Sequence, residues 1–402
     1  MNILIQSNAP WSHTGYGGPT KSLVRRLDEA GHTISVFCFY GLHGAPILMG
    51  NVQMLPPAED PWGNDVIEAH LAHVGAELLI TNMDAWVLHE YGKHGTYWAA
   101  WCPVDHKEAP PAVVNALQTC HKPLSYTRHG AQALRDAGLD RAEYMPIGIE
   151  SDGFYIDPEG REKMRQYLGV EKDEFLIGMV ANNRGFPVRK GFDITFESFA
   201  ELRKKRKVKL YCHTNPLPGP DRPDLSTFLR PLGLTMDDVL WPKTYDYMMG
   251  YSTMLMRHLY NAFDVLAVPS VGEGFLIPAV EAHACGKPVI ATNCTSLPET
   301  TCPDARYMLN KLMPKISVQQ AHWFFATPKE LTKGLLWAME HKGDEIMANR
   351  ARDFAVTNYD WDKLFGTKWL PLLDRIKEEI GQAKCGDIVD QAMAATLPIC
   401  PE

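Results

Sequence analysis

Two series of short apolar runs, separated by stretches of helical periodicity, limit the folds open to this chain. The first series is MNILIQS, TISVFCF, ELLITN, YWAAWCPV and PLSYTR, and the second is FLIGMVA, KLYCHT, VLWP, DVLAVPS and PVIAT. Such alternation is typical of parallel strands joined by crossover helices. At 402 residues the chain is also long for one core. We therefore predict an α/β protein of two doubly wound domains, with a cleft between the carboxyl ends of both sheets.

The polar segment EKDEF, residues 171–175, lies between the two series and predicts the interdomain linker. It places a Rossmann-like N-terminal domain at residues 1–170 and a second Rossmann-like domain at residues 171–358. A long helix is expected over about residues 362–380. From the residues alone, this helix either caps the second domain or crosses back to the first.

Composition narrows the class of protein. The net charge is −8, which gives no overall basic field for nucleic acid. No apolar run approaches the roughly 20 residues that span a bilayer, and MNILIQSNAPW lacks the features of a signal peptide. Nine cysteines without a CxxC pair indicate reduced thiols. These features predict a cytoplasmic protein without a transmembrane segment.

Two carboxylates flank an apolar segment in VGEGFLIPAVEAHACGKPVIAT. Glu273 falls in a glycine-flanked loop after a buried strand, and Glu281 falls about one turn into the helix that follows. At such a helix start, the backbone NH groups of Gly274, Phe275 and Leu276 would suit an anion. Glu281 could accept hydrogen bonds from a ligand's hydroxyl groups. The alternative is a solvent-facing helix residue and a plain loop charge.

A basic loop, ANNRGFPVRKGFD, follows the first strand of the second domain. It carries Arg184, Arg189 and Lys190 before a helix that begins after Gly191. Guanidinium and ammonium groups at the carboxyl end of a strand suit a diphosphate. The alternative is a solvated loop.

Two loops of the first domain are also candidates. In SNAPWSHTGYGGPTKS, Gly17 and Gly18 would let the backbone approach a ligand closely, although the loop matches neither GxGxxG nor a phosphate-binding GxxxxGK[ST]. In WCPVDHKEAPP, Asp105 and His106 end an apolar strand and should face the cleft, where His106 could exchange a proton. No cluster in the chain has convincing metal-ligand spacing.

Together these stretches resemble the retaining glycosyltransferases of the GT-B fold, in particular glycosyltransferase family 4. The resemblance rests on EGFLIPAVE, RGFPVRKG and LYNAFDVLAVPS, with support from TRHGAQALRDAGL, PIGIESDGF and CGKPVIATNCTSLPE. It covers most of the chain in order. It implies two facing Rossmann-like domains. It also implies that residues 359–384, containing NYDWDKLFGTKWLPLLDRI, form a helix that crosses back to the first domain before a tail at residues 385–402.

The resemblance also implies roles for the candidate residues. Arg184 and Lys190 would hold the diphosphate of a nucleotide-sugar donor, a UDP- or GDP-sugar, without a metal or other bound cofactor. Glu281 would bind the ribose, and Glu273 with Gly274 and Phe275 would contact the transferred sugar. Gly17 and Gly18 would approach the diphosphate, and Asp105 or His106 would lie near the reacting sugar.

Two alternative functions use the same fold. One is a nucleotide-sugar epimerase, and the other is a glycosyltransferase that acts on modified DNA bases. The only strongly basic run, RKKRKVK, lies in the second domain, where we interpret it as a solvated helix end. The acceptor stays open among lipid, glycan, protein, metabolite and nucleic acid.

Overall fold

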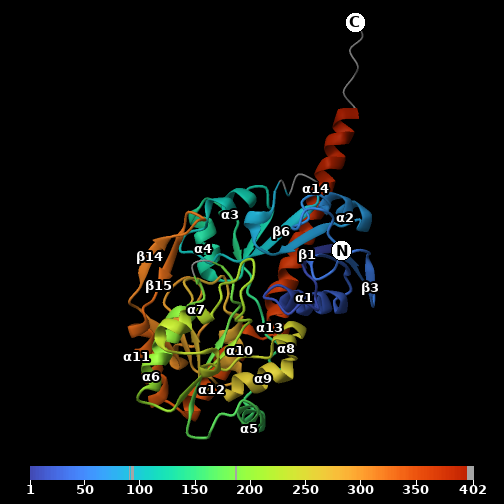
Figure 1. Ribbon diagram of the computed structural model, residues 1–402. Helices are drawn as coiled ribbons and strands as arrows, with labels where there is room; N and C mark the ends of the chain where they lie inside the picture. The colour runs from blue at the N-terminus through green and yellow to red at the C-terminus, as the bar shows by residue number, and fades with distance from the viewer. Residues whose placement is uncertain (90, 92–94, 186–187, 396–402) are drawn as a thin grey trace.

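The computed structural model describes residues 1–89, 91, 95–185 and 188–395, the last twelve of these by their backbone alone. It contains two parallel sheets, one above the other in Figure 1. The first sheet has eight strands in the order β3-β4-β2-β1-β5-β6-β7-β8. They span β1 (Asn2–Asn8), β2 (Thr33–Tyr40), β3 (Ile47–Met49), β4 (Val52–Leu55), β5 (Leu78–Asn82), β6 (Tyr97–Cys102), β7 (Lys122–Ser125) and β8 (Glu143–Tyr144). Only the β3–β4 pair is antiparallel among these strands.

Helices cover both faces of the first sheet. Ile3 and Ile5 of β1 enter one hydrophobic cluster and Leu4 enters the other, because successive side chains of a strand point to opposite faces. Burial on both faces explains why the sequences of these strands are continuous apolar runs. The helices are α1 (Gly17–Glu29), α2 (Ile67–Val74), α3 (Pro111–Ala116) and α4 (Arg128–Asp136), with a 3-10 turn, η1, at Ala85–Val87.

The second sheet has the order β10-β9-β11-β12-β13. Its strands are β9 (Phe175–Val180), β10 (Val208–His213), β11 (Val265–Val268), β12 (Val289–Thr292) and β13 (Arg306–Leu309), and an antiparallel hairpin adds β14 (Met313–Ile316) and β15 (His322–Phe325). The surrounding helices are α5 (Pro158–Tyr167), α6 (Phe192–Arg203), α7 (Ser226–Leu229), α8 (Thr244–Met249), α9 (Thr253–Ala262), α10 (Ile277–Ala284), α11 (Pro328–Glu340) and α12 (Glu345–Tyr359). The short 3-10 turns η2 (Arg230–Leu232), η3 (Met236–Asp238) and η4 (Pro303–Ala305) lie among them.

The prediction of a strand at VLWP is wrong. Leu240 forms a single bridge to Tyr211 of β10, with backbone bonds to Leu210 and Cys212. Pro242 follows and has no NH group, so the ladder cannot continue. The hairpin β14–β15 was not predicted from the sequence.

The chain crosses between the two sheets twice, and the crossing segments lie side by side. Ile149 and Asp360 form a parallel bridge, with Ile149 NH donating to the carbonyl of Tyr359. Helix α5 packs against α9, so the first crossing precedes α5 instead of following it at residues 171–175 as expected. Within the described residues, no helix has the length and apolar character needed to cross a membrane.

After the second crossing, the chain returns to the first sheet. It forms α13 (Trp361–Leu364), a π-helical turn, η5 (Phe365–Trp369), and α14 (Leu370–Ala395). Trp361, Trp369 and Leu373 are buried in a core cluster of the first sheet. Figure 1 shows α14, in red, running past β1 and β6 and projecting beyond the body of the protein.

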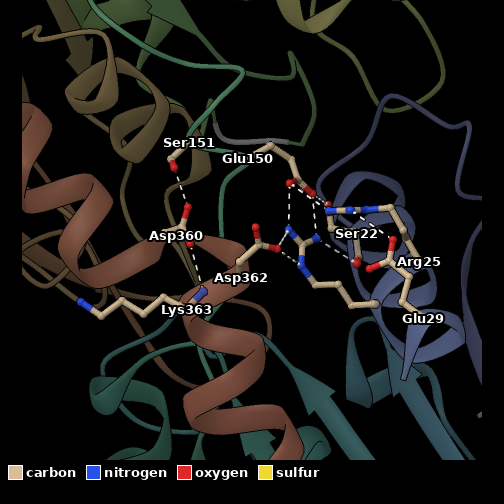
Figure 2. Close-up of polar contacts among 9 residues, drawn as sticks. Ser22, Arg25, Glu29, Glu150, Ser151, Asp360, Asp362 and Lys363 are labelled. Atoms are coloured by element: carbon tan, nitrogen blue, oxygen red, sulfur yellow. Dashed lines mark hydrogen bonds and ion pairs between the residues drawn. The ribbon is translucent and has the colours of Figure 1, made fainter. Parts of the chain in front are cut away.

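A buried arginine of α1 joins the crossing segments. Arg26 donates to both carboxylate oxygens of Glu150 at 2.9 Å and to Oδ1 of Asp362 at 2.9 and 2.6 Å. It also donates to the carbonyl of Ser22 at 3.1 Å. Figure 2 shows Ser22, Glu150 and Asp362 gathered there from three separate segments. We call Arg26, Glu150 and Asp362 the hinge cluster, because they join both crossings to the first domain.

Candidate active site

The central pair of the site is Lys190 and Glu273. Lys190 follows β9 and Glu273 follows β11, two neighbouring parallel strands whose carboxyl ends meet at one edge of the second sheet. Lys190 Nζ donates to the two oxygens of Glu273 at 2.6 and 2.8 Å. Both side chains are largely buried, and burial lowers the pKa of Lys190 although Glu273 acts in the opposite direction.

The second pair links the two domains. Arg189 Nη2 donates to Oδ2 of Asp105 at 2.6 Å, and Asp105 follows β6 of the first sheet. Burial would raise the pKa of Asp105, but Arg189, His106 and Lys190 outweigh it and lower the pKa to about 2. Asp105 is therefore an anion throughout the physiological range. We call Asp105, His106, Arg189, Lys190 and Glu273 the interdomain site.

His106 is fully buried in this site. Its Nδ1 lies 2.7 Å from Oδ1 of Asp105, and its Nε2 lies 2.8 Å from the hydroxyl of Ser317. The imidazole stacks on the indole of Trp323, with ring centroids 4.9 Å apart. Ser317 and Trp323 belong to the β14–β15 hairpin, so the hairpin of the second domain fixes a side chain of the first.

Glycines permit close approach of the two domains here. A Cβ at Gly272 would lie 2.1 Å from the carbonyl oxygen of Asp105, and a Cβ at Gly274 would lie 2.2 Å from Cβ of Pro103. Any side chain would therefore separate the loop after β11 from the loop after β6. Phe275, next in sequence, packs against core clusters of both domains, and Leu276 is buried at the start of α10.

The loop after β12 holds the backbone of Glu273. Glu273 NH donates to the hydroxyl of Thr295 at 3.1 Å, and the hydroxyl of Ser296 donates to the Glu273 carbonyl at 2.7 Å. Thr295 has φ 47°, a left-handed conformation rare for a β-branched residue. Such strain persists where surrounding contacts enforce it, and it is concentrated at functional sites.

Glu281 lies on α10, where the sequence predicted it. Its Oε2 accepts a hydrogen bond from the hydroxyl of Tyr260 at 2.7 Å. Burial raises the pKa of Glu281 to about 7, and the bond from Tyr260 only partly opposes this. The group therefore titrates near neutral pH.

Arg184, Gly17 and Gly18 were also predicted as site residues. Arg184 is exposed and lies 3.4 Å from Asp221, so the structure groups Arg189, and not Arg184, with Lys190. Phe186 and Pro187 of the same loop lie outside the described residues. Gly17 begins α1, and a Cβ there would lie 2.2 Å from the carbonyl oxygen of Ser12, whereas a Cβ at Gly18 would meet nothing within 4 Å.

Asp84 was missed by the sequence reasoning. It follows β5, the neighbour of β6 in the first sheet, and it is hydrogen-bonded by Tyr16 of the glycine loop. Burial, with the nearby charge of Asp105, raises the pKa of Asp84 to about 6. A lone aspartate in TNMDAW carries no motif; only its position after a parallel strand could have identified it. Among the described residues, no three His, Cys, Asp or Glu side chains are grouped to hold a metal ion.

Comparisons with known proteins identify the fold. Residues 174–314 match the family model of the glycosyl transferases group 1. Sucrose-phosphate synthase from Thermosynechococcus elongatus superposes with a TM-score of 0.71 at 17% identity, over 98% of this chain and 100% of that one. The chain has the GT-B fold of the glycosyltransferase superfamily. The GT-B protein HepE of Anabaena, solved in complex with UDP-glucose, superposes with a TM-score of 0.67 at 16% identity, over 95% of this chain and 100% of that one.

Similarity to curated relatives is partial. A D-inositol 3-phosphate glycosyltransferase of Xylanimonas cellulosilytica is 27% identical over 224 residues, which are 52% of this chain and 50% of that protein. An MMP alpha-(1->4)-mannosyltransferase of Mycolicibacterium hassiacum is 32% identical over 166 residues, which are 41% of this chain and 34% of that protein. The chain thus spans a third to a half of the length of these relatives. The superfamily and the fold agree with the sequence prediction, while assignment to family 4 stays a prediction.

Proposed function

We propose that this protein is a retaining glycosyltransferase that moves a sugar from a nucleotide-diphosphate sugar to a hydroxyl group. The interdomain site carries the proposal. Lys190 and Arg189 extend from one loop and meet a carboxylate from each domain, Glu273 and Asp105. The group 1 family match, and the UDP complexes of HepE, support a nucleotide-sugar donor.

Lys190 would stabilise the departing diphosphate, with Arg184 of the same loop as the second cation. The bond from the anomeric carbon to the diphosphate oxygen breaks, and a bond from that carbon to the acceptor oxygen forms. The hydroxyl proton leaves with the nucleoside diphosphate. Negative charge grows on the diphosphate during this step, and a preorganised cation in a partly buried site stabilises it strongly.

The carboxylates would orient the donor. Glu273, together with the backbone of Gly274 and Phe275, would contact the hydroxyl groups of the transferred sugar. Glu281, in the α10 helix that begins after Leu276, would accept hydrogen bonds from the ribose. Gly17 and Gly18 would let the first domain approach the diphosphate.

Asp105 would act at the reacting carbon. Its pKa of about 2 keeps it ionised, and a carboxylate stabilises the positive charge that a glycosyl group develops in the transition state. His106 would hold Asp105 in place from the Ser317 and Trp323 side. The EGF loop at Glu273 to Phe275, together with the basic loop RGFPVRKG, favours transfer over the epimerase alternative.

We also propose that the reaction needs no metal, since the charge of the diphosphate would be matched by Lys190 and Arg184. The seven cysteines whose side chains the structure describes are free and buried, which supports the proposed cytoplasmic location.

A thermal-shift screen tests the donor proposal. The chain and its Glu281→Ala variant would be melted with UDP, GDP, ADP and TDP and with their common sugar conjugates. A ligand at 100-fold its Kd stabilises a fold by about 2.7 kcal/mol. We expect one nucleotide to raise the melting temperature of the wild type and to do so much less in the variant. No response to any of these nucleotides would contradict the proposal.

A further inference from the structure

Four adjacent strands of the first sheet, β4, β2, β1 and β5, each lead into an aromatic residue at the carboxyl edge. These residues, which we call the aromatic rim, are Trp62, Tyr40, Trp11 and Trp86. Tyr40 is 56% exposed, Trp11 37% and Trp86 41%. Large exposed aromatic groups gathered at one edge are typical of a binding surface.

The rim is held rigidly. Trp11 Nε1 donates to the carbonyl of Gly41 at 3.0 Å, which ties the loop after β1 to the end of β2. Trp86 meets Trp62 edge to face, with ring centroids 6.4 Å apart. The carbonyl of Trp62 accepts a hydrogen bond from Gln6 of β1 at 2.7 Å. A preorganised platform loses little conformational entropy when a ligand stacks on it.

The rim continues toward the interdomain site. Asp84 lies two residues before Trp86, accepts a hydrogen bond from the hydroxyl of Tyr16, and lies near Asp105, Arg184 and Arg189. A partly exposed carboxylate beside aromatic rings can accept a hydrogen bond from a ligand hydroxyl while the rings cover the apolar face of the ligand.

The negative charge of the rim loops limits the class of ligand that can bind there. Residues 9–16, 41–46, 56–66 and 83–89 carry four carboxylates, Glu59, Asp60, Asp65 and Asp84, and no lysine or arginine. A polyanion would be repelled here, because nucleic acids are bound largely through lysine and arginine contacts to phosphate. The basic run at residues 203–209 is remote and partly paired, Arg203 with Asp238 and Lys207 with Asp173.

We propose that the acceptor is a neutral carbohydrate, whose sugar rings stack on Trp11 and Trp86 while a hydroxyl group binds Asp84. This inference rests on the proposed function, since it names the acceptor of the same site. The CH-rich face of a sugar ring covers an indole, and the ring's hydroxyl groups supply donors for a carboxylate.

Calorimetric titration of the full chain tests the inference. The probes are maltotriose, cellotriose and chitotriose, with a 12-nucleotide single-stranded DNA as the competing class and UDP and GDP as donor-side ligands. We expect saturable binding of at least one trisaccharide, weakened about tenfold by Trp11→Ala and by Trp86→Ala. Leu48→Ala, an exposed apolar residue on the lateral strand β3, is the matched control and should leave binding unchanged.

The donor titration separates the two proposals. Both tryptophan variants should bind the nucleotide as the wild type does, and Asp84→Asn should weaken binding of the trisaccharide. A chain that binds UDP or GDP but no trisaccharide, or that binds DNA through Trp11 and Trp86, would overturn the carbohydrate inference alone. Trisaccharide binding without any nucleotide binding would instead overturn the donor proposal and support the carbohydrate site.

Discussion

The interdomain site and the hinge cluster each pair a buried cation with carboxylate groups, Lys190 with Glu273 and Arg26 with Glu150 and Asp362, yet the two cations differ in how fully they are paired. Arg26 donates from its guanidinium to Glu150, Asp362 and the carbonyl of Ser22. Burial lowers the pKa of Arg26, but its partners outweigh burial and the pKa is raised. For Lys190 the balance is reversed: burial prevails over Glu273, and the pKa is lowered.

This difference fits a structural role for Arg26 and a ligand-binding role for Lys190. A cation whose partners outweigh its desolvation gains little from a further anion. A cation that is still undercompensated gains from each anion that arrives, and a diphosphate brings at least two negative charges. The pairing of Lys190 with one carboxylate is therefore suited to a ligand site, and that of Arg26 to holding the two domains together.

The strongest test of the comparison is Lys190→Ala. We expect kcat to fall about 10³-fold, because a preorganised group that stabilises the departing charge is lost. The fold should persist, as judged by the thermal melt. The rate of sugar transfer is the measurement, and Lys190→Arg, which keeps the charge, should retain more activity than the alanine variant. Near-normal turnover of Lys190→Ala would remove the diphosphate assignment.

The hinge cluster should respond in stability instead. We expect Arg26→Met to lower the free energy of unfolding by about 2 kcal/mol, less than for a fully buried pair, because water can reach the exposed Asp362. Arg25→Met removes a more exposed charge of the same helix, 3.4 Å from Glu150, and should change the free energy of unfolding by less than about 1 kcal/mol. Denaturant titration measures the free energy of unfolding of both variants. Equal changes in the free energy of unfolding would show that the Arg26 contacts stabilise the fold no more than those of a surface arginine.

Glu281 provides a smaller effect that depends on pH. Its pKa of about 7 means that the folded protein binds a proton that the unfolded chain releases between about pH 4.5 and 7, so this group's contribution to stability falls as pH rises through that range. Ribose binding needs the ionised form. We expect the affinity for UDP-glucose, or for the donor identified by the screen, to rise about tenfold from pH 6 to pH 8.

The Glu281→Gln variant is the control for this titration. It keeps the shape of the side chain but cannot ionise, so its affinity should be nearly constant between pH 6 and pH 8. A wild type without pH dependence would count against Glu281 as the ribose ligand.

The smallest expected effect is that of a chelator. If Lys190 and Arg184 neutralise the diphosphate, EDTA should leave the transfer rate unchanged. The rate would be measured before and after EDTA treatment, with excess Mg²⁺ added back. Full loss of activity in EDTA, restored by the metal, would contradict the proposed metal-free mechanism.

Much of the second domain could be predicted from the sequence. Strands β9, β10, β11 and β12 coincide with predicted apolar runs, and Glu273 and Glu281 lie in the predicted loop and helix. These assignments depend on local pattern, because a buried parallel strand is continuously apolar. The VLWP prediction failed because a short apolar run does not reveal whether its neighbours can continue a ladder.

The sequence by itself determined the two-domain α/β class and which loops follow the strands, because burial on both faces leaves a local signature. Tertiary structure decided which charges meet. Arg189, not Arg184, joins Asp105, a residue 84 positions away, and Trp323 of an unpredicted hairpin stacks on His106. Such pairs depend on how two sheets approach, and that approach is set by the backbone contacts of Gly272 and Gly274 and by the hinge cluster, none of which leaves a periodic pattern in the chain.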